Sequence, residues 1–128
     1  MYCLDTNIII DLFKGDTRVK EHIAGLGADI ATTPISLAEL FKGAFLSHSA
    51  EQRIRQVYEL SRRIEVLQFS VAAASIFGQL FAHLKKKGQQ APELDLLIAS
   101  IALAHEATLI TRDKTGFAHI PGLKVVVI

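Results

Sequence analysis

The chain has 128 residues, half of them apolar, and its 14 basic and 13 acidic residues leave a formal net charge of +1. On its own, this near balance favours neither a nucleic acid nor a membrane surface as a partner. The length predicts a single domain over residues 1–128 with a core large enough to fold without disulfides. A single cysteine, Cys3, cannot form an internal disulfide and argues against a thiolate metal centre. Without a basic secretory signal or a run of about eighteen uncharged apolar residues, we expect a cytoplasmic protein with no membrane segment.

The first half of the chain alternates short apolar strands with helices. After Leu4 the apolar residues recur at helical spacing, so Asp5 marks the corner where a strand turns into a helix. Thr33 followed by Pro34 predicts a later helix start. The expected elements are a strand at 2–4, helices over 6–13 and 17–24, a strand at 29–32, a helix over 34–45 and a polar helix over 51–63.

The second half repeats this alternation. The helix that begins near Pro92 is apolar nearly all round, which predicts that it is buried. The expected elements are a strand at 64–68, helices over 71–87 and 92–104, and strands at 107–111 and 123–128. Right-handed crossovers between parallel strands place helices on both faces of a sheet, so the fold class is α/β with a covered parallel sheet.

Four acidic residues lie at positions that the sequence pattern does not predict to face solvent. Asp5 and Asp113 each follow a strand and would emerge at the same edge of a parallel sheet, where ligands usually bind. Glu39 and Asp95 lie among apolar residues on predicted helices. Ordinary structural roles remain open for each: a helix cap for Asp5, a capping box with Ser36 for Glu39, a first-turn acid for Asp95, and a turn aspartate for Asp113.

A cluster of these four acids would require a cation. Two carboxylates about 4 Å apart repel by about 4 kcal/mol at an effective dielectric of about 20. Ligands that are all oxygen favour Mg²⁺, with Mn²⁺ as a substitute, over zinc. Such a site performs metal-assisted attack of water on a phosphodiester. With four acids engaged, the rest of the surface would carry fourteen basic groups against nine acidic ones, a balance that favours a polyanion.

The order of the four acids resembles the motifs of PIN-domain ribonucleases, specifically the VapC toxins of type II toxin-antitoxin pairs. The resemblance covers nearly the whole chain and rests on Leu4-Asp5-Thr6-Asn7-Ile8, Ser36-Leu-Ala-Glu39-Leu40, Asp95-Leu-Leu-Ile-Ala99-Ser100 and Ile110-Thr111-Arg112-Asp113. It implies a PIN-like three-layer α/β/α fold with a parallel five-stranded sheet of order 3-2-1-4-5.

The resemblance also implies roles for individual residues. Asp5, Glu39, Asp95 and Asp113 would be both the catalytic residues and the Mg²⁺ ligands, and Thr6 and Asn7 would line the same pocket. The implied activity is endonucleolytic cleavage of RNA, with tRNA as one possible substrate. The implied partners are a second copy in a homodimer and an antitoxin of VapB type whose disordered tail folds over the toxin. Many relatives carry an acid just before the phenylalanine of the last motif, whereas Gly116 precedes Phe117 here, which favours one tight metal ion.

RNA binding also needs cations that neutralise phosphates. We expect Arg112 and Lys114, on either side of Asp113, to contact the substrate, with Arg112 favoured.

Two other functions remain open. One is a housekeeping RNA-processing nuclease of the same fold without an antitoxin. The other is a non-catalytic module that binds RNA or protein, against which the four intact acids count, because clustered negative charge does not help to hold a polyanion.

Overall fold

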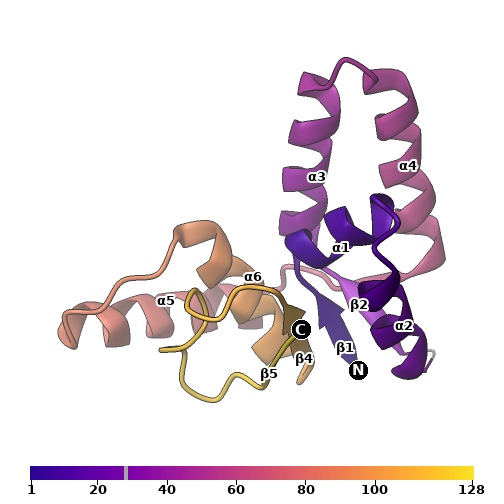
Figure 1. The fold of residues 1–128 in the computed structure, drawn as a ribbon. Coiled ribbons are helices and arrows are strands. Elements are labelled where there is room, and N and C mark those ends of the chain that lie inside the picture. The colour runs from indigo at the N-terminus through magenta and orange to yellow at the C-terminus, as the bar shows by residue number, and fades with distance from the viewer. Residues whose placement is uncertain (28) are drawn as a thin grey trace.

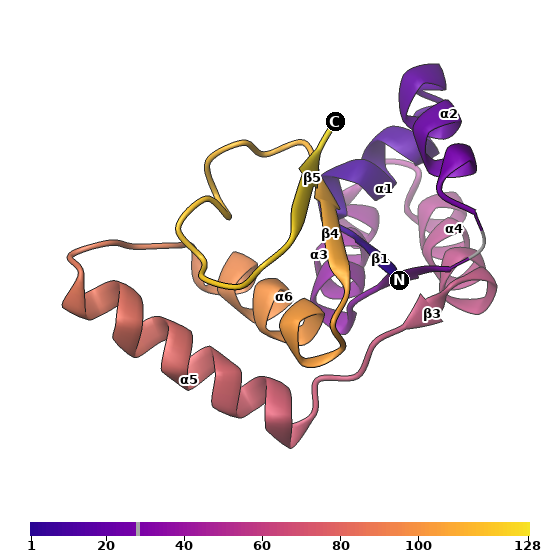
Figure 2. The same cartoon turned by 90° about the horizontal axis from the view of Figure 1, so that it is seen from below.

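A computed structural model describes residues 1–27 and 29–128, and its centre is a five-stranded parallel sheet (Figures 1 and 2). The strands lie in the order β3-β2-β1-β4-β5, and every neighbouring pair is parallel. This order confirms the expected topology. The strands are β1 (Tyr2–Leu4), β2 (Ile30–Thr32), β3 (Glu65–Val66), β4 (Thr108–Thr111) and β5 (Val125–Val127).

Six helices connect the strands and cover both faces of the sheet. In Figure 1, α3 and α4 form an upright pair beside α1 and α2, whereas α5 and α6 lie on the opposite side of the sheet. The helices are α1 (Thr6–Phe13), α2 (Thr17–Gly25), α3 (Pro34–Leu46), α4 (Ala50–Arg63), α5 (Val71–Lys86) and α6 (Glu93–Ala104). The result is the expected three-layer α/β/α arrangement.

Each strand divides its side chains between two hydrophobic cores. In β1, Cys3 faces the core under α5 and α6, and Leu4 faces the core under α1 to α4. In β4, Leu109 and Ile110 alternate in the same way, because successive side chains of a strand point to opposite faces. Burial raises the pKa of the Cys3 thiol to about 12, with a further contribution from the charge of Asp5. Cys3 therefore stays protonated as a core residue.

The helix starts agree with most of the expected signals. Thr33 caps α3, because its Oγ1 accepts a hydrogen bond of 3.1 Å from the Ser36 backbone N–H. Ser36 therefore lies inside the helix, and the capping box that paired it with Glu39 is wrong. Helix α6 begins at Glu93, one residue after Pro92, and is the most buried helix, as expected.

The two edge strands are shorter than the sequence pattern predicts. Strand β3 covers only Glu65–Val66 of the expected 64–68, and β5 covers Val125–Val127 of the expected 123–128. Each of these strands has a partner on one side only. The N–H groups of Leu67 and Ile128, just beyond the two strands, still donate to Thr32 and Thr111 at 2.9 and 3.0 Å. Among the described residues, no helix is long and apolar enough to cross a membrane.

Candidate active site

The register of the central strands places Asp5 directly beside the end of β4. Leu4 pairs with Ile110, and the Asp5 backbone N–H donates to the Ile110 carbonyl at 2.9 Å. The Asp5 side chain is 5% exposed. Its Oδ1 accepts from the Thr6 backbone N–H at 2.8 Å, so Asp5 also caps α1, and its Oδ2 accepts from Thr111 Oγ1 at 2.6 Å. The site therefore begins at the corner that the sequence pattern indicates.

Thr111, the last residue of β4, connects three parts of this edge. Its hydroxyl donates to Asp5 and accepts from the Asp113 backbone N–H at 3.1 Å and from Asn7 Nδ2 at 3.4 Å. Thr111 is fully buried. Sequence analysis assigns Thr111 no role of its own. The signal that could have identified it is a hydroxyl at the end of a predicted strand, two residues before an acid.

Glu39 reaches the site from α3. Its Oε1 accepts a hydrogen bond of 2.8 Å from Thr6 Oγ1. Thr6 thus uses its backbone N–H for Asp5 and its hydroxyl for Glu39, which fixes two carboxylates from one residue. The expectation that Thr6 lies at the site agrees with this geometry.

Asp95 lies in the first turn of α6 and is half-buried. Burial, followed by the charges of Asp5, Asp113 and Glu39, raises the pKa of the Asp95 carboxyl to about 6. A helix N-terminus stabilises a carboxylate, so the dipole is not the dominant influence on this residue. Burial also raises the pKa of Asp5, and the charges of Glu39 and Asp113 add to the increase. The four acids therefore share one electrostatic environment.

Asp113 differs from Asp5 and Asp95 because its loop stabilises its charge. Its Oδ1 accepts from the backbone N–H groups of Gly116 at 3.0 Å and Thr115 at 2.9 Å, and from Thr115 Oγ1 at 3.2 Å. The N–H donors of Gly116 and Thr115 lower the pKa of Asp113. It is both a turn aspartate and the fourth acid of the cluster.

The donor set fits a hard divalent cation. All four groups are carboxylates, and the raised pKa values of Asp5 and Asp95 reflect burial together with the like charges around them. Within the described residues, no three His, Cys, Asp or Glu side chains lie close enough together to hold a metal ion as they stand. The ligand roles of the four acids therefore remain a proposal that rests on their chemistry and mutual electrostatic interaction.

Arg112, which we expect from the sequence to contact the substrate, is paired with two acids in the structure. Its Nη1 lies 3.0 Å from Asp11 Oδ2 and 3.4 Å from Asp16 Oδ2. Its backbone N–H donates to Asn7 Oδ1 at 3.2 Å, which places Asn7 beside the site but facing the loop. Lys114 is exposed and makes no ion pair with any residue that the structure describes. Lys114 thus remains available for a phosphate, whereas Arg112 is engaged by two acids.

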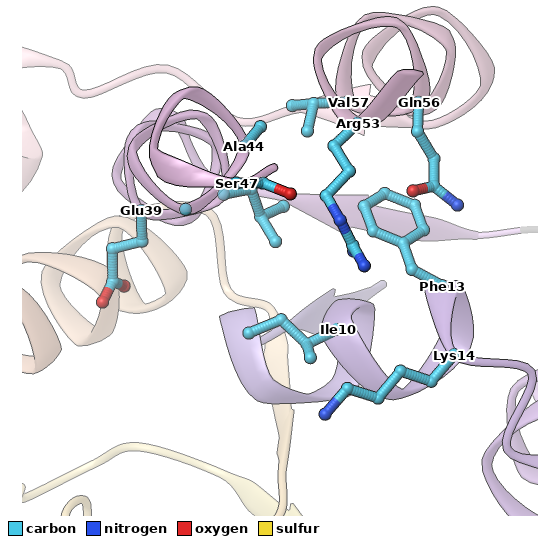
Figure 3. Close-up of a pocket in the computed structure, with 11 residues that line it drawn as sticks. Ile10, Phe13, Lys14, Glu39, Ala44, Ser47, Arg53, Gln56 and Val57 are labelled. Carbon is cyan, nitrogen blue, oxygen red and sulfur yellow. The ribbon is translucent and has the colours of Figure 1, made fainter. Parts of the chain in front are cut away.

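A groove of about 310 Å³ between α1, α3 and α4 borders the site at Glu39. Apolar side chains line much of it, including Ile10, Phe13 and Val57. Figure 3 shows Arg53 and Lys14 extending into the groove from opposite walls, whereas the Glu39 carboxylate at its edge points away from them. The sequence does not show that these two cations share a groove, because they lie on α4 and at the end of α1.

Three comparisons with known proteins agree with this architecture. Residues 2–123 match the family model described as PIN domain. Ribonuclease VapC1 of Haemophilus influenzae (strain R2866) is 37% identical over 127 residues, which cover 97% of this chain and 95% of the relative. The tRNA(fMet)-specific endonuclease VapC of Shigella flexneri is 29% identical, with 96% and 94% coverage. The structure of VapBC2 from Rickettsia felis bound to a promoter DNA fragment aligns with a TM-score of 0.91 and 33% identity, covering 99% of this chain and 98% of that one. The chain therefore belongs to the PIN domain family, within its VapC group.

Proposed function

We propose that this chain is a metal-dependent endoribonuclease and the toxin of a toxin-antitoxin pair. The observation that supports the proposal is that burial, followed by the charges of Asp5, Asp113 and Glu39, raises the pKa of Asp95 to about 6. Carboxylates in such a setting are stabilised by a cation. The relatives named as ribonucleases and endonucleases support the enzyme class.

Asp5, Glu39, Asp95 and Asp113 would hold Mg²⁺ or Mn²⁺. A hard cation bound there would lower the pKa of a water molecule and neutralise charge that develops on the phosphate oxygens. Thr6 and Thr111 orient Glu39 and Asp5 through hydrogen bonds of 2.8 and 2.6 Å. Lys114 would contact a substrate phosphate beside the cut. The substrate is RNA, and tRNA is the first class to test because one relative is named a tRNA(fMet)-specific endonuclease.

Cleavage assays on purified protein test the enzyme proposal. We expect RNA to be cut internally with Mg²⁺ or Mn²⁺ and to stay intact with EDTA. Mutation of a residue that only hydrogen-bonds a metal ligand typically reduces activity by about 10- to 100-fold. Asp5 would be a ligand itself, so Asp5→Asn should reduce cleavage by at least about 100-fold. Glu59→Gln, which neutralises an exposed acid on α4, is the matched control and should leave cleavage unchanged. Equal cleavage by the wild type and Asp5→Asn would reject the catalytic assignment.

The toxin role needs a test in cells. Expression of the chain alone should arrest bacterial growth, and Asp5→Asn should relieve the arrest. Normal growth together with efficient RNA cleavage in vitro would instead favour the housekeeping nuclease. Binding of RNA without cleavage under any metal condition would favour the non-catalytic module.

The groove beside Glu39 is the surface that we propose for the antitoxin. Its apolar walls fit an amphipathic segment, and Lys14 and Arg53 would pair with acidic groups on that segment. The similar structure from Rickettsia felis is described as VapBC2 bound to a DNA fragment from their promoter. Lys14→Glu combined with Arg53→Glu should abolish neutralisation by the cognate antitoxin and retain RNA cleavage. Loss of cleavage with neutralisation retained would assign the two cations to RNA binding.

The assembly of this chain into a homodimer stays a prediction.

A further inference from the structure

The loop after β4 contains a glycine, Gly116, whose backbone does not require glycine. The glycines with a positive φ are Gly15, Gly27, Gly88 and Gly122, so Gly116 adopts a conformation that other residues can reach. Space, rather than backbone freedom, distinguishes this position. A Cβ atom at Gly116 would overlap Asp113 Oδ2 and would lie 3.0 Å from Asp113 Cγ and 3.1 Å from Asp95 Oδ2. The space beside Gly116 thus holds oxygens of two of the four acids.

Asp113 cannot move aside without losing hydrogen bonds. Its Oδ1 accepts three hydrogen bonds, from the Thr115 N–H, the Thr115 hydroxyl and the Gly116 N–H. These bonds hold Oδ1 in place, and Oδ2 of the same carboxylate occupies the space beside the Gly116 Cα. A side chain at position 116 would rotate the carboxylate and break the bonds that hold Oδ1. The same side chain would approach Asp95 Oδ2 from the other direction.

We propose that Gly116 is a positioning residue for the metal site, because its missing side chain lets Asp113 Oδ2 face Asp95. The inference rests on the proposed function, since it concerns the cation that these acids would hold. In this chain Asp113 Oδ2 fills the space that a side chain at position 116 would take, so a Cβ there turns Asp113 away from Asp95 and weakens binding of the cation. Gly116 itself touches neither the substrate nor the reacting atoms.

A double-mutant cycle with Mn²⁺ tests whether Gly116 acts through Asp113. Mn²⁺ affinity is measured by calorimetry on metal-free wild type, Gly116→Ala, Asp113→Ala and the double variant. We expect Gly116→Ala to weaken Mn²⁺ binding by about tenfold or more in the wild-type background. In the Asp113→Ala background the same change should alter the affinity by less than about twofold, because the carboxylate that it displaces is gone.

Gly78→Ala is the matched control, because a Cβ at this exposed position on α5 meets no atom within 4 Å. It should leave Mn²⁺ affinity unchanged. Thermal unfolding of the metal-free proteins gives a second readout: if Gly116→Ala lowers the melting temperature or fails to fold, Asp113→Ala should restore stability.

Three outcomes would overturn the inference. The first is wild-type Mn²⁺ affinity in Gly116→Ala, the second is an equal loss of affinity in both backgrounds, and the third is a folding defect that Asp113→Ala does not relieve. If the wild type itself fails to bind Mn²⁺ with or without RNA, the proposed metal site fails and this inference fails with it. Binding by the wild type that is unaffected by Gly116→Ala rejects the role of Gly116 alone.

Discussion

Asp95 links the charge of the site to the stability of the folded chain. Its pKa is about 6 in the folded protein, above the ordinary value of 3.8. A group whose pKa is higher in the folded state binds more protons there, so stability falls as pH rises from about 4 to above 6. Asp95→Asn removes this penalty. We expect the metal-free variant to gain on the order of 1 kcal/mol at about pH 7.5, once partial exposure of the side chain is allowed for.

Urea unfolding in EDTA measures this gain. The advantage of Asp95→Asn should shrink at about pH 5 and disappear below about pH 4, where both folded and unfolded states are protonated. Cleavage should fall by at least about 100-fold in the same variant. A variant less stable than the wild type at neutral pH would show that Asp95 supports α6 rather than strains it.

Thr111 is the residue through which hydrogen bonding organises the site. Thr111→Val keeps the shape but removes the donor to Asp5 and the acceptor for the Asp113 N–H. Burying the freed groups should lower the free energy of unfolding by about 1–3 kcal/mol. The pKa of Asp5 should rise further, because the hydrogen bond from Thr111 lowers it. Mn²⁺ affinity should therefore fall by about 10- to 100-fold.

Thr111→Ser separates the hydroxyl from the methyl group of the same side chain. If the hydroxyl organises the site, the serine variant should recover most of the Mn²⁺ affinity measured by calorimetry. Equal affinity of the valine variant and the wild type would remove Thr111 from the metal site.

At the scale of elements, Arg112 joins the end of β4 to α1 and to the start of α2. Asp11 lies on α1, and Asp16 caps α2 through the backbone N–H groups of Arg18 and Val19. Arg112 contacts both acids and immediately precedes Asp113. Exposed ion pairs contribute about 0–1 kcal/mol to stability, so we expect this bridge to matter more for placing the Asp113 loop than for the stability of the fold.

Kinetic constants distinguish a positioning role of Arg112 from a phosphate contact. Asp11→Asn combined with Asp16→Asn frees Arg112, and Asn still caps α2 well. We expect this double variant and Arg112→Gln to lower kcat with little change in KM, because both loosen the loop that carries Asp113. Lys114→Gln, which removes an exposed cation from the same loop, should mainly raise KM. A double variant that cleaves as well as the wild type or better would return Arg112 to the substrate-binding role.

The elements show which parts of the architecture a sequence can predict. Alternating strand and helix patterns predict the central strands and the helices to within a residue or so, because β1 and β4 are buried on both faces and read as apolar runs. The pairing of Arg112 with Asp11 and Asp16 spans about a hundred residues of sequence and leaves no local pattern. The role of Gly116 is equally hidden, because it depends on where the side chain of Asp113 points.

At the scale of the whole molecule, the four acids come from both sides of the sheet. Glu39 lies on α3, which packs on one hydrophobic core, and Asp95 lies on α6, which packs on the other. Asp5 directly follows β1, the central strand, and Asp113 lies two residues beyond the end of the neighbouring strand β4. A cation bound by all four would therefore connect the two cores, and its binding energy would stabilise the whole fold rather than one loop.

Thermal unfolding with EDTA, Mg²⁺ or Mn²⁺ tests this connection. A metal that binds only the folded state adds about 2.7 kcal/mol at one hundred times its Kd. For a chain of 128 residues this corresponds to a rise in Tm of roughly 10 °C. The rise should persist in Glu59→Gln and vanish in Asp5→Asn. It should also shrink as pH falls below about 6, because protons on Asp95 compete with the metal. A metal-induced rise of equal size in Asp5→Asn would place the cation elsewhere, because Asp5 is the buried acid of the four.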